Sequence, residues 1–89
     1  MINDNHKNMN EINLNFMKKI FEEALDLKDY DLKLASTFEN VPGWDSLGHM
    51  RIISHIEEKL KLEFDIDEII GVDTVSKLIE MTKKKMKLL

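Results

Sequence analysis

The triplet Asp45-Ser46-Leu47 places a serine hydroxyl where a chemical group could be attached. The triplet follows a long loop that ends at Trp44, and it opens an amphipathic run, so we expect Ser46 at a helix N-terminus. Peptide dipoles and unpaired N–H groups at such an end favour an anion. The hydroxyl is therefore well placed to carry a phosphodiester and whatever group hangs from it. Serine also favours helix N-caps, so Ser46 could act as a cap and nothing more.

No other residues have the spacing of a catalytic or metal centre. His49 is the only local candidate for a base next to Ser46, and no acid is placed to support it, which disfavours a hydrolytic enzyme. His49 and His55 are separated by about 240° around a helix, so they do not form a metal pair. The carboxylates of 65–68 lack the central glycine of a calcium loop and are explained by helix capping. We predict no metal site.

The composition predicts one small helical domain. The chain has 89 residues, 43% of them hydrophobic, which is enough for a single compact core. Three glycines and one proline favour helices over strands. The absence of cysteine excludes disulfides, thiolate catalysis and cysteine ligands. No apolar run is as long as a membrane span and the first residues lack the blocks of a signal peptide, so we predict a cytoplasmic protein.

The acidic and basic residues are unevenly distributed. The net charge is −4, but Lys83, Lys84, Lys85 and Lys87 are four of the 13 basic residues, which leaves 9 basic against 17 acidic residues in 1–82. An acidic body argues against nucleic acid as a partner and favours basic patches on other proteins. The four lysines are explained by a solvated helix C-terminus, where their positive charges complement the negative end of the helix dipole. Contact with a membrane or a nucleic acid is the alternative explanation.

Hydrophobic periodicity predicts the helices. A first helix begins at a capping box from Asn8 to Glu11 and ends near Leu27. The loop 28–45 has no sustained period, and a loop of this length is uncommon without a function. Its apolar residues suggest that it is pinned to the helices; they are Tyr30, Leu32, Leu34, Phe38, Val41 and Trp44.

Three further helices follow the loop. The second runs from Ser46 to Leu60, with a core stripe at Ile52, Ile53, Ile56 and Leu60. A short third helix has Asp65 as N-cap, Glu68 closing a capping box and Gly71 as its stop. A final helix begins at Thr74 or Val75. We predict an all-α bundle of three main helices and one short helix, made of a flexible segment 1–8, a domain 9–84 and a basic tail 85–89.

This arrangement resembles the acyl carrier protein family over about residues 12–82. The resemblance rests on residues 43–47 (Gly-Trp-Asp-Ser-Leu), on Phe38 eight residues before the serine, on 56–60 (Ile-Glu-Glu-Lys-Leu) closing the second helix, and on Phe64 and Ile66 at the third. It implies that a phosphopantetheinyl transferase moves phosphopantetheine from coenzyme A onto the hydroxyl of Ser46. The thiol of that arm then holds an acyl or aminoacyl group as a thioester.

The resemblance also implies a function without catalysis. Such a carrier is no enzyme, and its arm presents the activated group to a loading enzyme and then to an acyltransferase or synthase. Some carriers shelter the acyl chain between their helices. We expect a monomer with one covalent cofactor, phosphopantetheine on Ser46.

Partner recognition in the family uses the second helix. By position, Leu47 and Met50 are the apolar contacts, and Asp45, Glu57 and Glu58 are the acidic ones. Four of these have an alternative explanation, because the two apolar residues could be peripheral core and the two glutamates could be solvated charges.

Two departures from fatty acid carriers indicate a specialised pathway. Arg51, flanked by His49 and His55, stands where those carriers have an acidic residue, and it would repel basic docking surfaces. Trp44 ends a loop that usually has small residues. We therefore expect polyketide, nonribosomal peptide, D-alanyl or surface-glycan acylation rather than fatty acid biosynthesis. The alternative function is an unmodified helical adaptor that binds a partner through the acidic face of the second helix.

Overall fold

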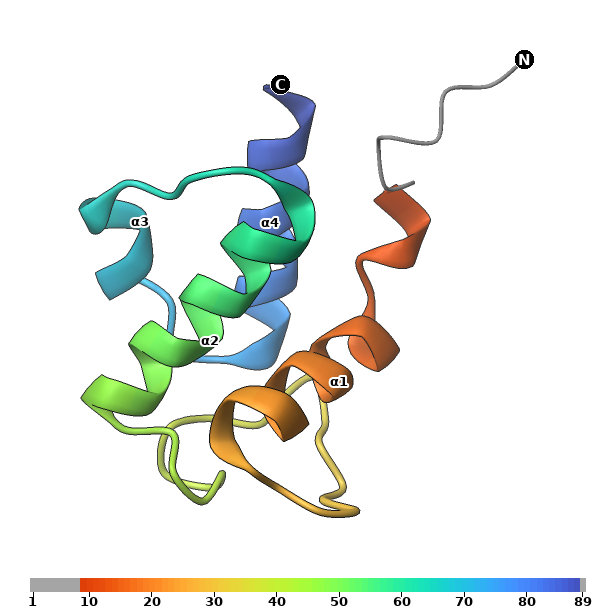
Figure 1. The fold of residues 1–89 in the computed structure, drawn as a ribbon, viewed down its shortest axis with the longest axis vertical. Coiled ribbons are helices and arrows are strands. Elements are labelled where there is room, and N and C mark those ends of the chain that lie inside the picture. Colours follow the sequence, from red (N-terminus) through yellow and green to blue (C-terminus); the bar gives the residue numbers. More distant parts are fainter. Residues whose placement is uncertain (1–8, 89) are drawn as a thin grey trace.

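The computed structural model describes residues 9–88, and it confirms the predicted all-α architecture. A 3-10 turn η1 (Met9–Glu11) precedes the helices α1 (Leu14–Leu25), α2 (Ser46–Leu60), α3 (Ile66–Ile70) and α4 (Val75–Lys87). Helix α1 packs against both α2 and α4, and α3 lies on the opposite side of α2 from α1 (Figure 1). The predicted flexible segment 1–8 lies outside the described residues.

The predicted start of the first helix is wrong. Helix α1 begins at Leu14 because Asn13 caps it, with the Oδ1 atom of Asn13 accepting a hydrogen bond of 3.1 Å from the N–H of Phe16. Glu11 belongs to η1 instead, and Asn8 lies outside the described residues. The helix ends at Leu25, two residues before the predicted end, where Asp26 adopts a left-handed conformation with φ 56°.

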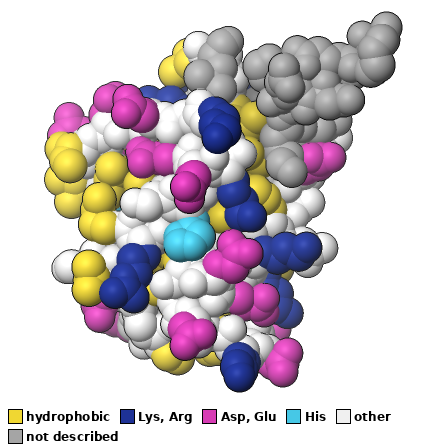
Figure 2. Space-filling model, viewed as in Figure 1, with side chains coloured by type: hydrophobic (Ala, Val, Ile, Leu, Met, Phe, Trp, Pro, Cys, Tyr) yellow, Lys and Arg dark blue, Asp and Glu magenta, His cyan; other side chains and the backbone are white. Residues whose placement is uncertain are grey.

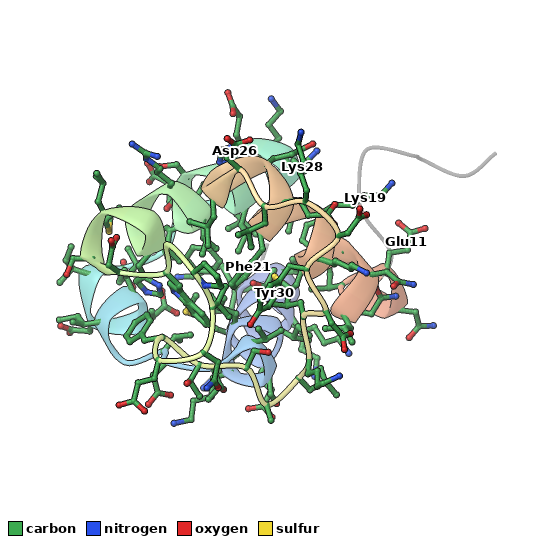
Figure 3. All side chains as sticks on the ribbon, turned by 90° about the horizontal axis from the view of Figure 1, so that it is seen from below. Glu11, Lys19, Phe21, Asp26, Lys28 and Tyr30 are labelled. Atoms are coloured by element: carbon green, nitrogen blue, oxygen red, sulfur yellow. The ribbon has the colours of Figure 1, made fainter. Side chains whose placement is uncertain are left out.

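The core forms where α1, α2 and α4 meet. The predicted stripe of α2 is confirmed at Ile52, Ile53 and Ile56, which are buried, whereas Leu60 is half-buried. Phe21 of α1 points into this interior, while Lys19 points outward (Figure 3). The other fully buried side chains are Ile12, Met17 and Ile20 from the first part of the chain and Val75, Leu78 and Thr82 from α4.

The long loop is fixed to the helices, as predicted, although not through every apolar residue. Leu32, Val41 and Trp44 are buried in the core, whereas Leu34 and Phe38 are exposed. Two backbone hydrogen bonds also hold the loop to the start of α4. The N–H group of residue 75 donates to the carbonyl of residue 36, and the N–H group of residue 76 donates to the carbonyl of residue 34. The loop is therefore a defined structure that can place the residues at its end.

The short helix α3 has the predicted cap and is tied to α4. The N–H of Asp65 donates a 2.7 Å hydrogen bond to Glu68, and the helix stops at Gly71. The carboxylate of Glu68 also pairs with the Nζ atom of Lys85 at 2.8 Å. Hydrogen bonding to Lys85 lowers the pKa of Glu68, and the same bond raises the pKa of Lys85. Both groups are charged at neutral pH, and this stabilisation is lost as the pH falls through the lowered pKa of Glu68.

This pair lies beyond the predicted end of the domain at residue 84. Helix α4 continues to Lys87, and the side chain of Lys85 is only 15% exposed. The first three residues of the predicted basic tail therefore continue the helix, and Lys85 contributes to the placement of α3. Among residues 9–88, no helix is long and apolar enough to cross a membrane.

The start of α2 approaches the end of the loop so closely that only glycine fits at position 48. A Cβ atom added to Gly48 would lie 1.9 Å from the carbonyl oxygen of Gly43 and 2.9 Å from a methyl carbon of Leu25. The first of these neighbours is backbone, so it cannot move aside by a change of rotamer. Gly43 itself has φ 82°, a conformation that favours glycine.

We predict that Gly48→Ala lowers the free energy of unfolding by about 1–3 kcal/mol or more, because the backbone at 43 must shift. Urea unfolding followed by circular dichroism measures the change. Gly71→Ala is the matched control, since its Cβ atom would be 3.4 Å from the nearest atom and φ is −80°, and we expect it to change stability by less than about 1 kcal/mol. Equal stability of the two variants would contradict the close approach.

Candidate functional site

Ser46 is the first residue of α2, and it is exposed to solvent. The N-cap is Asp45, whose Oδ1 atom accepts a 2.9 Å hydrogen bond from the N–H of Gly48. The alternative in which Ser46 serves only as the cap is therefore wrong. Among the described residues, no hydrogen bond engages the hydroxyl of Ser46, so this group is available at the positive end of a helix.

Trp44 fixes the loop just before this helix end. Its side chain is only 2% exposed, and its ring makes an edge contact with Phe21 of α1 at 4.8 Å between centroids. Phe38 makes a second edge contact with it at 4.9 Å. Trp44 is thus an anchor of the loop, as predicted from its apolar character. Because Ser46 lies only two residues after this anchor, its position is fixed as well.

His49 lies beneath Ser46 on α2 and is buried, with 6% of its surface exposed. Its Nδ1 atom lies 2.9 Å from the indole Nε1 of Trp44, and its Nε2 atom lies 2.8 Å from the carbonyl oxygen of Ile69. An indole N–H only donates, so Nδ1 must accept, and the ring proton of the neutral histidine is on Nε2, which donates to Ile69. Both ring nitrogens are engaged, so His49 is not available as a base for Ser46.

His49 does not belong to the surface around Arg51, although the two residues are close in the sequence. Arg51 is exposed, but His49 lies in the interior and does not flank it. His55 is half-buried, and its Nδ1 atom lies 2.8 Å from the backbone carbonyl of Arg51. The sequence could not reveal this, because a histidine three residues after Ser46 is compatible with either an exposed or a buried face of the helix.

The other residues predicted for partner recognition lie in two different environments. Leu47 and Met50 are 63% and 43% exposed, so they are not peripheral core. Glu58 is exposed as well. Glu57 is half-buried, and its Oε2 atom accepts a 2.9 Å hydrogen bond from the N–H of Phe64, in the segment that leads to α3. Glu57 thus holds the connection between α2 and α3.

An open groove of about 530 Å³ begins beside Ser46 and runs between α2 and α3. Side chains from the loop and both helices line it: Phe38, Trp44, Asp45, Ser46, His49, Met50, Ile66, Ile69 and Ile70. Hydrophobic side chains gather at the α3 edge of the face seen in Figure 2. Sequence reasoning missed this groove. The available signal was the pair of apolar residues Ile66 and Ile70 in a short acidic helix. Both side chains are exposed in the structure, and exposed apolar residues that lie together mark binding surfaces.

The chemistry of this site is that of attachment. It offers one exposed hydroxyl, a helix end that favours an anion, and an apolar groove next to it. Within the described part of the chain, no group of three or more His, Asp or Glu side chains is placed to hold a metal ion.

Comparisons with known proteins point to the same chemistry. Residues 15–82 match the family described as the phosphopantetheine attachment site. An acyl carrier protein of Buchnera aphidicola is 33% identical over 69 residues, which are 78% of this chain and 86% of that protein. Acyl carrier protein 3 of Ralstonia nicotianae is 33% identical over 66 residues, or 74% of this chain and 76% of that one.

A solved structure has the same fold. The solution NMR structure of a holo acyl carrier protein from Geobacter metallireducens superimposes with a TM-score of 0.76 at 27% sequence identity. The match covers 84% of this chain and 86% of that one.

We predict that Glu57→Lys lowers the free energy of unfolding by about 1–3 kcal/mol, because the N–H of Phe64 loses its acceptor. Urea unfolding measures this change. The neighbouring Glu58→Lys is the matched control with the same change of charge, and Glu57→Gln, which keeps an acceptor oxygen, should be less destabilised than Glu57→Lys. If Glu58→Lys is as unstable as Glu57→Lys, charge rather than the hydrogen bond is responsible.

Proposed function

Because the chain belongs to the acyl carrier protein family, whose cofactor is phosphopantetheine, we propose that Ser46 is the residue that carries the phosphopantetheine arm. The observation that supports Ser46 is its exposed hydroxyl at the first residue of α2, left free by the cap at Asp45. Proteins of this family are carriers and not enzymes, and the chain holds acyl or aminoacyl groups as thioesters on the arm.

The attachment reaction needs a base that takes the proton of the Ser46 hydroxyl. In that step the serine oxygen forms a bond to a phosphorus of coenzyme A, the bond from that phosphorus to the nucleotide part breaks, and the hydroxyl proton is removed. His49 cannot take the proton, since both of its ring nitrogens are hydrogen-bonded in the interior. The base is therefore a group other than His49, and we propose that the phosphopantetheinyl transferase supplies it. The N-terminus of α2 stabilises the resulting phosphodiester anion.

The partners implied by the family are a phosphopantetheinyl transferase and enzymes that load, transfer or condense acyl groups. We infer that these enzymes dock on the exposed face of α2 around Ser46, through Leu47 and Met50 as apolar contacts. Asp45, Arg51, Glu57 and Glu58 would set the charge of that surface, with Glu57 contributing least because it is half-buried and hydrogen-bonded. A flexible arm raises the local concentration of its cargo for each docked enzyme, so tight binding is unnecessary.

The pathway is inferred from the surface of α2. The exposed guanidinium of Arg51 lies on the proposed docking face, and it disfavours enzymes whose docking surface is basic. This charge favours a specialised biosynthetic pathway over general fatty acid synthesis. Within that proposal the chain acts as a cytoplasmic monomer, and its carrier domain extends past residue 84 to Lys87, where α4 ends. No observation favours the unmodified adaptor.

We expect Ser46→Ala to abolish modification. The purified chain is incubated with coenzyme A and a broad-specificity phosphopantetheinyl transferase, and its intact mass is measured. The natural chain should gain one phosphopantetheinyl group, and Ser46→Ala should gain none while its stability changes by less than about 0.5 kcal/mol, since Asp45 is the cap. Ser54→Ala, an exposed serine on the same helix, is the matched control and should be modified fully. Modification of Ser46→Ala would place the arm elsewhere.

Arg51→Glu should increase transfer of a malonyl group to the chain by the malonyl transferase of fatty acid synthesis. We expect a gain of about two- to fivefold, the effect of an exposed charge pair, and we expect it to shrink as salt is added. Lys84→Glu changes the net charge equally but lies on α4, so its rate should stay unchanged. An Arg51→Glu rate equal to that of the natural chain would remove Arg51 as a determinant of partner choice.

A further inference from the structure

The groove beside Ser46 has an exposed apolar rim and a buried floor that contains hydrogen-bonded groups. Met50, Ile66 and Ile70 form much of the rim and are exposed. The floor is formed by Trp44, His49 and Ile69, each of them less than a tenth exposed. The floor is therefore the boundary between the groove and the core.

Hydrogen bonds hold this floor together across three segments. The indole of Trp44 at the end of the loop donates to His49 on α2, and His49 donates to the carbonyl of Ile69 near the end of α3. The rings of Trp44 and His49 also lie nearly parallel, at an angle of 24° with centroids 6.1 Å apart. Separation of α2 from α3 would break the second bond and disturb the first.

Opening this floor for a hydrocarbon chain has a cost that an alkyl chain cannot offset with hydrogen bonds. The carbonyl of Ile69 and the Nε2–H group of His49 would lose each other as partners in a buried place. A buried polar group left unpaired reduces the population of the opened state by about tenfold or more. The rim, in contrast, is already open, and a groove of about 530 Å³ is within the size range of small-ligand sites.

We propose that His49 is a specificity-determining residue that keeps the floor of the groove between α2 and α3 closed, so that acyl chains do not pass from the groove into the core. This inference rests on the proposed attachment of the arm to Ser46. A short acyl group lies in the rim groove when the arm folds back, and the carbons of a longer chain beyond that groove stay in solvent. The carrier is thereby suited to short acyl cargo, whose thioester it presents without first having to release it from a core.

The test uses a series of holo proteins loaded through Ser46 with butyryl, octanoyl or dodecanoyl groups and verified by intact mass. One measurement reports whether the floor of the groove is intact, and a second reports how accessible the acyl thioester is. The first is the indole N–H resonance of Trp44, the only tryptophan of the chain, with its hydrogen exchange rate. The second is the rate at which hydroxylamine cleaves each thioester.

In the natural chain we expect the three thioesters to be cleaved at rates within about twofold of one another, with the Trp44 resonance and its exchange unchanged by chain length. In His49→Ala, octanoyl and dodecanoyl thioesters should be cleaved about tenfold more slowly than butyryl, and indole exchange should be faster. His55→Ala on the same helix is the matched control and should behave as the natural chain. If His49→Ala does not fold, His49→Leu replaces it in the same comparison, because a leucine fills the space in the floor but makes no hydrogen bonds.

Protection that grows with chain length in the natural chain, together with a shifted Trp44 resonance, would overturn the inference and leave the carrier function intact. Equal cleavage of all three thioesters in folded His49→Ala and His49→Leu would also overturn it, because closure would then not depend on His49. Absence of any added mass on Ser46 would overturn the proposed function, and this inference with it.

Discussion

The buried hydrogen bonds from Trp44 to His49 and from His49 to Ile69 join the parts of the molecule on which the site depends. They connect the end of the long loop, the first turn of α2 and the short helix α3. Helix α3 has five residues, too few to be stable alone. It is placed by this bond on one side and by the pair between Glu68 and Lys85 on the other.

Close packing supplies the second constraint on the same region. The approach of Gly48 to the carbonyl of Gly43 brings the loop against the first turn of α2, and Trp44 between them packs on Phe21 of α1. Around Ser46, Trp44 and His49 point inward, and Asp45 caps the helix by accepting a hydrogen bond from the N–H of Gly48. The hydroxyl of Ser46 is left exposed at a helix end that the loop and the core hold in place, which suits the proposed attachment of an arm by another protein.

The sequence predicted much of this fold because its signals are local. The bounds of α2, the cap at Asp65 and the stop at Gly71 follow from periodicity and capping residues, and all were confirmed. The start of α1 was wrong because two asparagines compete as caps, and Asn13 makes the bond to Phe16. The burial of His49 and the bond from Phe64 to Glu57 depend on where α3 packs, and residue spacing does not encode that tertiary contact.

The same arrangement prevents His49 from acting as a base toward Ser46, although the two residues are only three positions apart. A base must lie within hydrogen-bond reach of the proton it removes, and it must have a free lone pair. The only accepting nitrogen of His49 is taken by the indole of Trp44, and its other nitrogen carries the proton that Ile69 accepts. The histidine thus contributes to shape rather than to reactivity. Under the proposed function, the chemistry at Ser46 belongs to the enzymes that dock on α2, and these partners rather than the carrier control the cargo.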